Sequence, residues 1–224
     1  MRRLIDLSHV VEAGMPTYPG LPGPVISEHL SREASRAHYA EGTTFHIGKI
    51  EMVGNTGTYI DSPFHRWADG PDLAALALEQ VADLEGLVFR ADPSRRAIGP
   101  ELFAPAGTDG VRGKAVLVHT GWSRHWGTDA YFHGHPFLTQ DAAQWLADAG
   151  VALVGIDSLN IDDTADGRRP VHSILLRAGI PIVEHLCRLE ELPDSGFRFH
   201  AVPVKVRGFS SFPVRAYAIV GGTS

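Results

Sequence analysis

The segment Gly54–His65, which reads Gly-Asn-Thr-Gly-Thr-Tyr-Ile-Asp-Ser-Pro-Phe-His, is the densest group of polar side chains in the chain. Gly57 suits a backbone conformation that is closed to other residues, and Pro63 pushes the residue before it into an extended form. Pro63 also excludes an ordinary helical pairing of Asp61 with His65. We therefore expect both side chains to project from a loop, where catalytic groups are common. The alternative is an Asx-type turn followed by a surface histidine.

A second pair of candidate residues lies far along the chain. His172 falls in the first turn of a helix that Pro170 is expected to begin, and Glu184 closes the apolar run Ile180–Val183. A carboxylate at the end of a buried run must be paired, ligated to a metal or placed at the mouth of its strand. Because the chain returns after the helix, both residues could reach one metal ion, whereas a solvated or capping histidine is the alternative for His172.

Other candidates are aromatic or imidazole side chains near these segments. His119 ends the apolar run Ala115–Val118, a place where α/β proteins bind ligands, so it is a candidate for lining the pocket. Trp67 and Trp122 would suit a flat, apolar substrate, although core packing explains them equally well. The pair His133 and His135 is read as part of a solvated loop.

The second half of the chain alternates between expected strands and helices. Apolar runs at 115–119, 151–157 and 180–184 predict buried strands. Thr139 is the expected N-cap of a helix that Gly150 ends, and Pro170 is expected to begin a second helix that ends before Gly179. This order predicts an α/β protein with parallel strands joined by right-handed crossovers. Pro181 indicates that the last of these strands lies at an edge of the sheet or begins late.

The first half is expected to contain strands and turns, and no internal repeat or linker divides the chain, so we expect a single domain over residues 1–224. Strands are predicted at 4–9, at 43–53 as a half-buried strand, at 197–206 and at 214–220, and a short helix is predicted around 73–81.

Composition limits the classes of function. A net charge of −6 without a basic stripe argues against a nucleic-acid partner. The chain contains no stretch of about 18 apolar residues, so no membrane span is predicted. The single cysteine, Cys187, excludes an internal disulfide framework and permits a cytoplasmic location. Twelve histidines favour an enzyme with a small-molecule substrate, because histidine is a common metal ligand and acid–base group.

Several short motifs follow one another in a familiar order. They are Ile5-Asp-Leu-Ser-His9, Tyr18-Pro-Gly20, Thr56-Gly-Thr58, Thr120-Gly-Trp122, Val154-Gly-Ile-Asp-Ser158, Val171-His-Ser-Ile-Leu-Leu176, Ile182-Val-Glu184 and Pro213-Val-Arg-Ala216. With these motifs the chain resembles, over nearly its whole length, the cyclase family that includes bacterial kynurenine formamidase and isatin hydrolase. The resemblance implies a three-layer β/β/α swivelling-domain fold of the cyclase/arylformamidase type, a homo-oligomer (dimer or tetramer), and hydrolysis at a divalent metal site.

The chain departs from the family at two metal-binding positions. The family motif is His-x-Gly-Thr-His-x-Asp-x-Pro-x-His, and Asn55 and Tyr59 stand where its first two histidines would be. Asp61, His172 and Glu184 match the remaining ligands, and His65 matches the last histidine. Two readings of the metal content follow: one divalent ion (Zn²⁺, Mn²⁺ or Mg²⁺) bound by Asp61, His172 and Glu184, or no metal.

The resemblance implies an arylformamidase-like hydrolase of a small aryl amide, lactam or lactone, in which His65 relays a proton or orients water. In the alternative without metal, Tyr59 and His65 would catalyse a cyclisation, isomerisation or dehydration, and Asn55 would help to bind the oxyanion. The last alternative is a non-catalytic binder of small molecules, in which Asn55 and Tyr59 only fill space.

Overall fold

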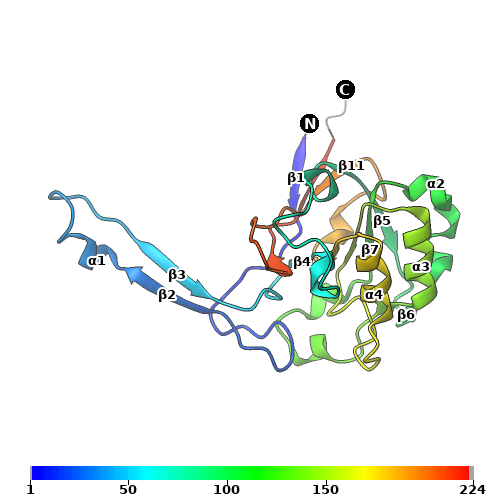
Figure 1. Ribbon diagram of the computed structural model, residues 1–224, viewed down its shortest axis with the longest axis horizontal. Coiled ribbons are helices and arrows are strands. Elements are labelled where there is room, and N and C mark those ends of the chain that lie inside the picture. Colours follow the sequence, from blue (N-terminus) through cyan, green and yellow to red (C-terminus); the bar gives the residue numbers. More distant parts are fainter. Residues whose placement is uncertain (1, 222–224) are drawn as a thin grey trace.

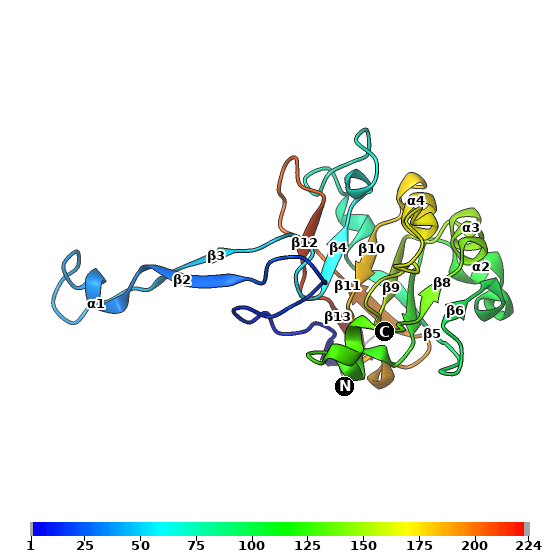
Figure 2. The ribbon, with the colours of Figure 1, turned by 90° about the horizontal axis from the view of Figure 1, so that it is seen from below.

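A computed structural model of the protein describes residues 2–221. Its centre is a nine-stranded mixed sheet with the strand order β1-β13-β11-β5-β7-β9-β10-β4-β12 (Figures 1 and 2). The strands are β1 (Arg3–Asp6), β4 (Tyr59–Asp61), β5 (Leu84–Arg90), β7 (Ala115–His119), β9 (Leu153–Ile156), β10 (Ile182–Glu184), β11 (Phe197–His200), β12 (Ser211–Pro213) and β13 (Tyr217–Val220). The neighbouring strands β5, β7, β9 and β10 are parallel, and the outer strands pair antiparallel.

Side chains of the parallel strands alternate between two hydrophobic cores, because successive residues of a strand point to opposite faces. In β7, Val116 and Val118 enter the core beneath the helices, and Leu117 enters the core on the other face. The helices α2 (Gly107–Val111), α3 (Gln140–Ala149) and α4 (Pro170–Arg177) lie on one side of the sheet (Figure 1). On the other side the outer strands close the second core with residues such as Ile5 and Ile60. The predicted α/β class is confirmed.

The two longer helices begin and end where local signals placed them. Thr139 Oγ1 accepts a hydrogen bond from the Ala142 amide at 3.2 Å, and Gly150 ends α3 with a φ of 71°. Helix α4 begins at Pro170, and the residue before it, Arg169, has left-handed backbone angles (φ 50°, ψ 59°). Strand β10 begins directly after Pro181 and lies between β9 and β4, so it begins late rather than lying at an edge.

A two-stranded arm, residues 25–51, extends away from the main sheet (Figures 1 and 2). It consists of β2 (Val25–Leu30), the short helix α1 (Arg32–Ser35) and β3 (Ile47–Glu51). Every residue of β3 is exposed, so the prediction of a half-buried strand over 43–53 is wrong in its length and its burial. The apolar alternation there forms cross-strand pairs, such as Ile26 opposite Ile50, instead of covering the core of the chain.

Two smaller predictions also differ from the structure. The segment 73–81 contains a 3₁₀ turn over Leu78–Gln80 instead of a regular helix. Strand β11 ends at His200 although the apolar pattern continues to 206, and Pro203, which has no amide hydrogen to donate to a ladder, lies in the irregular part. A further two-stranded sheet joins β6 (Ala97–Ile98) to β8 (Phe137–Leu138). Among residues 2–221, no helix has the length and apolar character needed to cross a membrane.

Candidate active site

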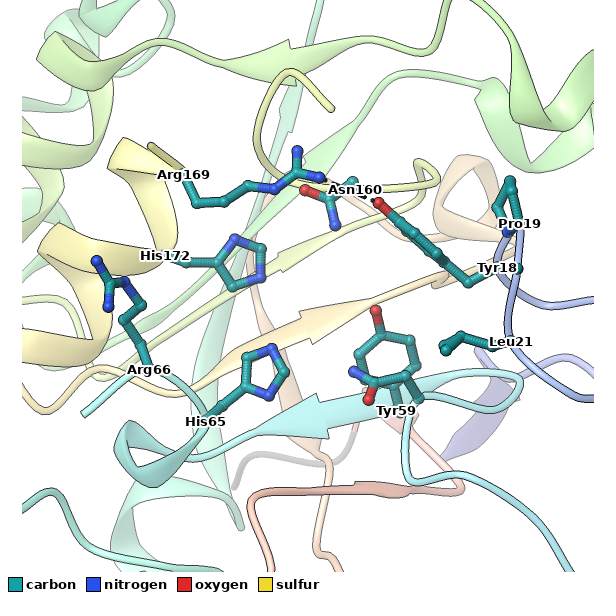
Figure 3. A pocket seen from close by; sticks show the side chains of 11 residues that line it. Tyr18, Pro19, Leu21, Tyr59, His65, Arg66, Asn160, Arg169 and His172 are labelled. Carbon is teal, nitrogen blue, oxygen red and sulfur yellow. Dashed lines mark hydrogen bonds between the residues drawn. The ribbon is translucent and has the colours of Figure 1, made fainter. Parts of the chain in front are cut away.

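A cavity of about 360 Å³ opens beside β4 and the beginning of α4 (Figure 3). Its walls come from four parts of the chain: the loop after Thr17, the segment around β4, the loop after β9 and the start of α4. The lining residues are Tyr18, Pro19, Gly20, Leu21, Asn55, Tyr59, His65, Arg66, Asn160, Arg169 and His172.

Strand β4 brings the first group of candidate residues together through its register with its two neighbours. Tyr59 lies opposite Glu184 of β10, and Asp61 lies opposite Ser211 of β12. Side chains directly opposite each other in antiparallel strands are close enough to bond. The Tyr59 hydroxyl accordingly donates to Glu184 Oε2, and the Ser211 hydroxyl donates to Asp61 Oδ1. Asp61 and Glu184 are fully buried, so these acids depend on such partners.

The loop between the arm and β4 has the backbone features that its sequence indicated. Gly57 has a φ of 64°, and Ser62 is extended (φ −87°, ψ 164°) before the 3₁₀ turn Pro63–His65. His65 sits on this turn, and its Nδ1 lies 3.0 Å from Ser211 Oγ and 3.7 Å from Asp61 Oδ1. Asp61, however, belongs to strand β4 and does not project from a loop as predicted, because β4 pairs on both sides.

His172 is oriented by an acid that the sequence reasoning did not single out. Asp162 Oδ2 lies 2.6 Å from His172 Nδ1, and the same carboxylate accepts the backbone amides of Val171 and His172 at 2.7 and 3.0 Å. With Nδ1 held in this way, the Nε2 atom lies 3.7 Å from both Asp61 Oδ2 and Glu184 Oε1. The structure therefore brings His172 and Glu184 to the same site as Asp61 and His65.

Burial and mutual charges shift the pKa values of these groups. Burial raises the pKa of Glu184 to about 7, although the charge of His172 opposes this shift. Burial acts to lower the pKa of His172, but the hydrogen bond to Asp162 and the charges of the nearby Asp61 and Glu184 outweigh burial and raise the pKa to about 10. For Asp61, burial is outweighed by His65 and His172, which lower the pKa of the carboxyl. The site thus holds negative charge around one imidazolium when no metal is bound.

The donor set fits a divalent cation. Asp61 Oδ2 is buried without any hydrogen-bond partner and faces His172 Nε2. Ligand atoms of Asp61, His65 and His172 all lie within 4.8 Å of one another. A histidine whose other ring nitrogen is held by a carboxylate is the usual arrangement for a metal-binding imidazole.

Asn55 and Tyr59, at the two positions where the family motif has histidine, also reach the acids. Asn55 Nδ2 lies 3.5 Å from Asp61 Oδ1, and Tyr59 is 2% exposed with its hydroxyl bonded to Glu184. Burial, with the charges of Glu184 and Asp61, raises the pKa of Tyr59 well above its ordinary value. The Tyr59 hydroxyl could donate its proton to a substrate only after its hydrogen bond to Glu184 is broken.

Three residues predicted to bind substrate lie elsewhere. His119 ends β7, which β9 and β10 separate from β4, and its ring contacts Arg90. The Trp122 indole donates to the Tyr131 carbonyl at 3.0 Å, and the Trp67 indole donates to the Ser173 carbonyl at 3.2 Å. None of the three lines the cavity.

Other residues take those positions in the cavity wall. Tyr18 and Leu21 supply its apolar surface, and Asn160, Arg66 and Arg169 supply polar groups that the sequence reasoning missed. Tyr18 belongs to a recognised motif and could have been found from it. Arg66 follows His65 directly and Arg169 lies three residues before His172, so their nearness in the chain was a signal for both. The reading of His135 as a solvated residue is wrong, because it is 1% exposed and its Nε2 lies 3.1 Å from the Asp162 carbonyl oxygen.

The fold and the site define an α/β protein with a buried carboxylate–imidazole cluster at the edge of a small cavity, which is an arrangement typical of metal-assisted enzymes. Comparisons with known proteins agree with this class. The family model Cyclase, described as "Putative cyclase", matches residues 5–163, and the chain belongs to this family.

Relatives match over nearly the full length of the chain. A kynurenine formamidase from Bacillus cereus is 28% identical over 219 residues, which cover 95% of each chain. A solved structure described as a potential metal-dependent hydrolase with cyclase activity is 25% identical, with a TM-score of 0.81 and full coverage of both chains. Isatin hydrolase A from Labrenzia aggregata has the same fold, with a TM-score of 0.81, 22% identity and coverage of 98% of this chain and 94% of its own.

Proposed function

We propose that the protein hydrolyses small aryl amides, lactams or lactones with the help of one divalent cation, in an arylformamidase-like reaction. The observation that carries this proposal is the buried, unpartnered Oδ2 atom of Asp61, which faces the Nε2 atom of His172. The full-length similarity to kynurenine formamidases supports the type of substrate.

Asp61, His172 and Glu184 would hold the cation, which we expect to be Zn²⁺, Mn²⁺ or Mg²⁺. Carboxylate oxygens and an imidazole nitrogen suit all three ions. When bound, such a cation polarises a carbonyl group and makes water more acidic. Asp162 keeps the Nδ1 atom of His172 engaged at 2.6 Å, so the Nε2 atom remains available to the cation.

His65 is the proton carrier of the proposed reaction. It lines the cavity, and its ring is held in place by Ser211, whose Oγ atom lies 3.0 Å from His65 Nδ1. We propose that His65 accepts a proton from the water that attacks the carbonyl carbon and then donates it to the leaving nitrogen as the C–N bond breaks. The products are a carboxylic acid and an amine, which remain one molecule when the substrate is a lactam.

The apolar wall of the cavity would bind the aromatic part of the substrate. Tyr18 and Leu21 lie on one side of the cavity, and His65 and His172 lie on the other (Figure 3). Aromatic and aliphatic side chains bind flat rings by burial, and a few polar groups fix their orientation. Asn55 and Asn160 are the polar groups that we propose for this task.

The proposal is tested with formanilide and isatin as substrates of protein purified without chelators. We expect hydrolysis that chelation abolishes and that Zn²⁺ or Mn²⁺ restores. Asp61→Asn should lose bound metal and at least about 100-fold in kcat/KM, while the matched control Asp69→Asn, on an exposed acid bonded to Arg177, should keep both. His65→Gln should keep the metal and lose activity; loss of metal from this variant would make His65 a ligand instead. Full activity in metal-free protein would contradict the proposal.

We also propose that the protein is a homo-oligomer, a dimer or a tetramer, and that the arm contacts a second copy. The loop 15–24 is partly used by the cavity, since Tyr18 and Leu21 line it. The arm instead exposes its apolar residues: Ile26 is 51% and Ile50 is 48% exposed. A two-stranded hairpin is marginally stable by itself, so a partner surface would stabilise it.

A further inference from the structure

The guanidinium group of Arg169, in the cavity wall, has no acidic partner among the described residues. Arg169 is partly buried and donates to the Asp163 carbonyl oxygen at 2.9 Å and to the Tyr18 hydroxyl at 3.3 Å. Across the described residues 2–221, no carboxylate lies within 4.0 Å of it. Its neighbour Arg168 is paired, with a nitrogen 2.8 Å from Asp166 Oδ2. A partly buried guanidinium that lines a cavity without a counter-ion is suited to bind an anionic group of a ligand.

The backbone of Arg169 supports a role in binding. Its angles (φ 50°, ψ 59°) lie in the left-handed region, which residues other than glycine rarely adopt. Strained residues of this kind are concentrated at ligand-binding sites. The side chain of Arg169 runs along the cavity wall, and its guanidinium is directed toward the hydroxyl of Tyr18 (Figure 3).

Charged side chains of both signs lie at or near the cavity. Asp61 and Glu184 are buried acids, and a second anion near them would be repelled. Arg66 also lines the cavity, donates to Ser173 Oγ at 3.0 Å and, among the residues described, has no ion-pair partner within 4.0 Å. Two positive charges in the cavity wall attract an anionic group, and Arg169 is the one that is bonded to Tyr18, across the cavity from His65 and His172 (Figure 3).

We propose that Arg169 and Tyr18 form a carboxylate-binding subsite, so that the preferred substrates are aryl amides or lactams that carry a free carboxylate besides the bond to be cleaved. Arg169 would donate to the carboxylate with its guanidinium. The hydroxyl of Tyr18 already accepts from Arg169, which leaves its own proton for a second hydrogen bond to the ligand. This inference rests on the proposed function for the position of the reacting bond.

Matched pairs of formylated anilines test the subsite. Each isomer of formamidobenzoate is compared with the formamidobenzamide of the same geometry, which has nearly the same shape but no charge and carries an NH2 group in place of one carboxylate oxygen. We expect the wild-type kcat/KM ratio of carboxylate to amide to exceed about 10 for the preferred isomer, and Arg169→Gln to lower this ratio roughly 10- to 100-fold. Arg168→Gln, whose partner Asp166 lies outside the cavity lining, is the control and should leave the ratio unchanged. An equal ratio in wild type and Arg169→Gln, or a wild-type preference for the uncharged amide, would overturn the inference.

Binding measurements separate this inference from the proposed hydrolysis. If the wild type hydrolyses none of these compounds, the proposed function fails, and calorimetric titration with benzoate and benzamide still tests the subsite. Tighter binding of benzoate that weakens about 10-fold or more in Arg169→Gln supports the subsite. Equal affinities of wild type and Arg169→Gln for benzoate overturn it.

Discussion

The contact between Asp162 and His172 shows how one side chain prepares another for a ligand. The carboxylate bonds to the ring nitrogen and to two backbone amides at the start of α4, so it fixes both the ring and the turn that carries it. Asp162 is an expected positioning residue, since it lies behind the imidazole and does not line the cavity.

Asp162→Asn should lower the affinity for Zn²⁺ or Mn²⁺ about 10- to 100-fold, because the ring loses its charged partner while all of the proposed metal ligands remain. Calorimetric titration of metal into the apo-protein measures this change. Asp163→Asn is the control, because its side chain only accepts an amide of its own turn, that of Ala165. Equal affinities in wild type and Asp162→Asn would show that the orientation of His172 does not limit metal binding.

Asn55 and Tyr59 stand where the family motif has histidine, so a variant that restores the histidines can test for a gain of metal affinity. Asn55 and Tyr59 already reach the carboxylates of Asp61 and Glu184, so histidines at both positions would bring imidazoles to the same acids. We expect the double variant Asn55→His with Tyr59→His to bind Zn²⁺ or Mn²⁺ more tightly, because imidazole is a better donor to these ions than an amide or a phenol.

Metal titration of the double variant and of the wild type decides this prediction. The single change Tyr59→Phe is the control, since it removes the hydroxyl without adding a donor. Formamidase activity should rise in the double variant if hydrolysis is limited by metal binding. Unchanged metal affinity would mean that these two positions do not serve the metal.

The sequence predicted the candidate residues of the site better than it predicted their partners. Asp61, His65, His172 and Glu184 could be singled out because each stands in a local pattern, and the structure brings them together. Ser211 could not, because it is 150 residues from Asp61 in the chain and becomes its neighbour only through the register of β12 with β4. Partners that depend on strand register leave no local signal.

At the scale of elements, helices and strands differ in how well they could be predicted. The limits of α3 follow from Thr139 and Gly150, which act within one turn of the helix. The strand at 47–51 has the alternation of a half-buried strand, but its apolar side chains lie on the exposed arm and do not cover the core of the chain. An alternating pattern marks one face of a strand as apolar and does not say whether the core of the chain covers that face.

The arm leads to a prediction about assembly. Ile26→Asp with Ile50→Asp places two like charges directly opposite each other on the arm, which would disrupt an apolar contact with a second copy. We expect light scattering to give a smaller molecular mass for this variant than for the wild type at micromolar concentration.

The control for this prediction introduces an acid at an exposed apolar residue outside the arm. Leu78→Asp serves this purpose, because Leu78 is 63% exposed. Its mass should equal that of the wild type. A wild-type protein that is monomeric, or an arm variant with an unchanged mass, would contradict the proposed contact.

At the scale of the whole molecule, the acid stability should depend on histidines that are buried in neutral form. His9 packs against Trp126 with the ring centroids 3.9 Å apart, and its buried Nε2 atom has no hydrogen-bond partner. Burial, followed by the charge of His185, lowers the pKa of His9 to about 3. The sequence gave no sign of this contact, because Trp126 is distant from His9 in the chain.

The direction of the pH dependence follows from the lowered pKa of His9. In the unfolded chain the imidazole gains a proton as the pH falls through about 6.5, whereas in the folded protein it stays neutral down to about 3. The unfolded state therefore binds more protons in this range, and the contribution of His9 lowers the free energy of unfolding by at most about 1.4 kcal/mol per pH unit as the pH falls.

His9→Phe should remove this contribution, because phenylalanine keeps the stacking on Trp126 and forfeits no hydrogen bond at Nε2. The free energy of unfolding, measured with urea between pH 7 and pH 4, should fall less steeply in the variant than in the wild type. His133→Gln, at an exposed histidine, is the control and should follow the wild-type curve. Parallel curves for His9→Phe and the wild type would mean that His9 is already protonated in the folded protein, or that the region around Trp126 opens before the protein unfolds.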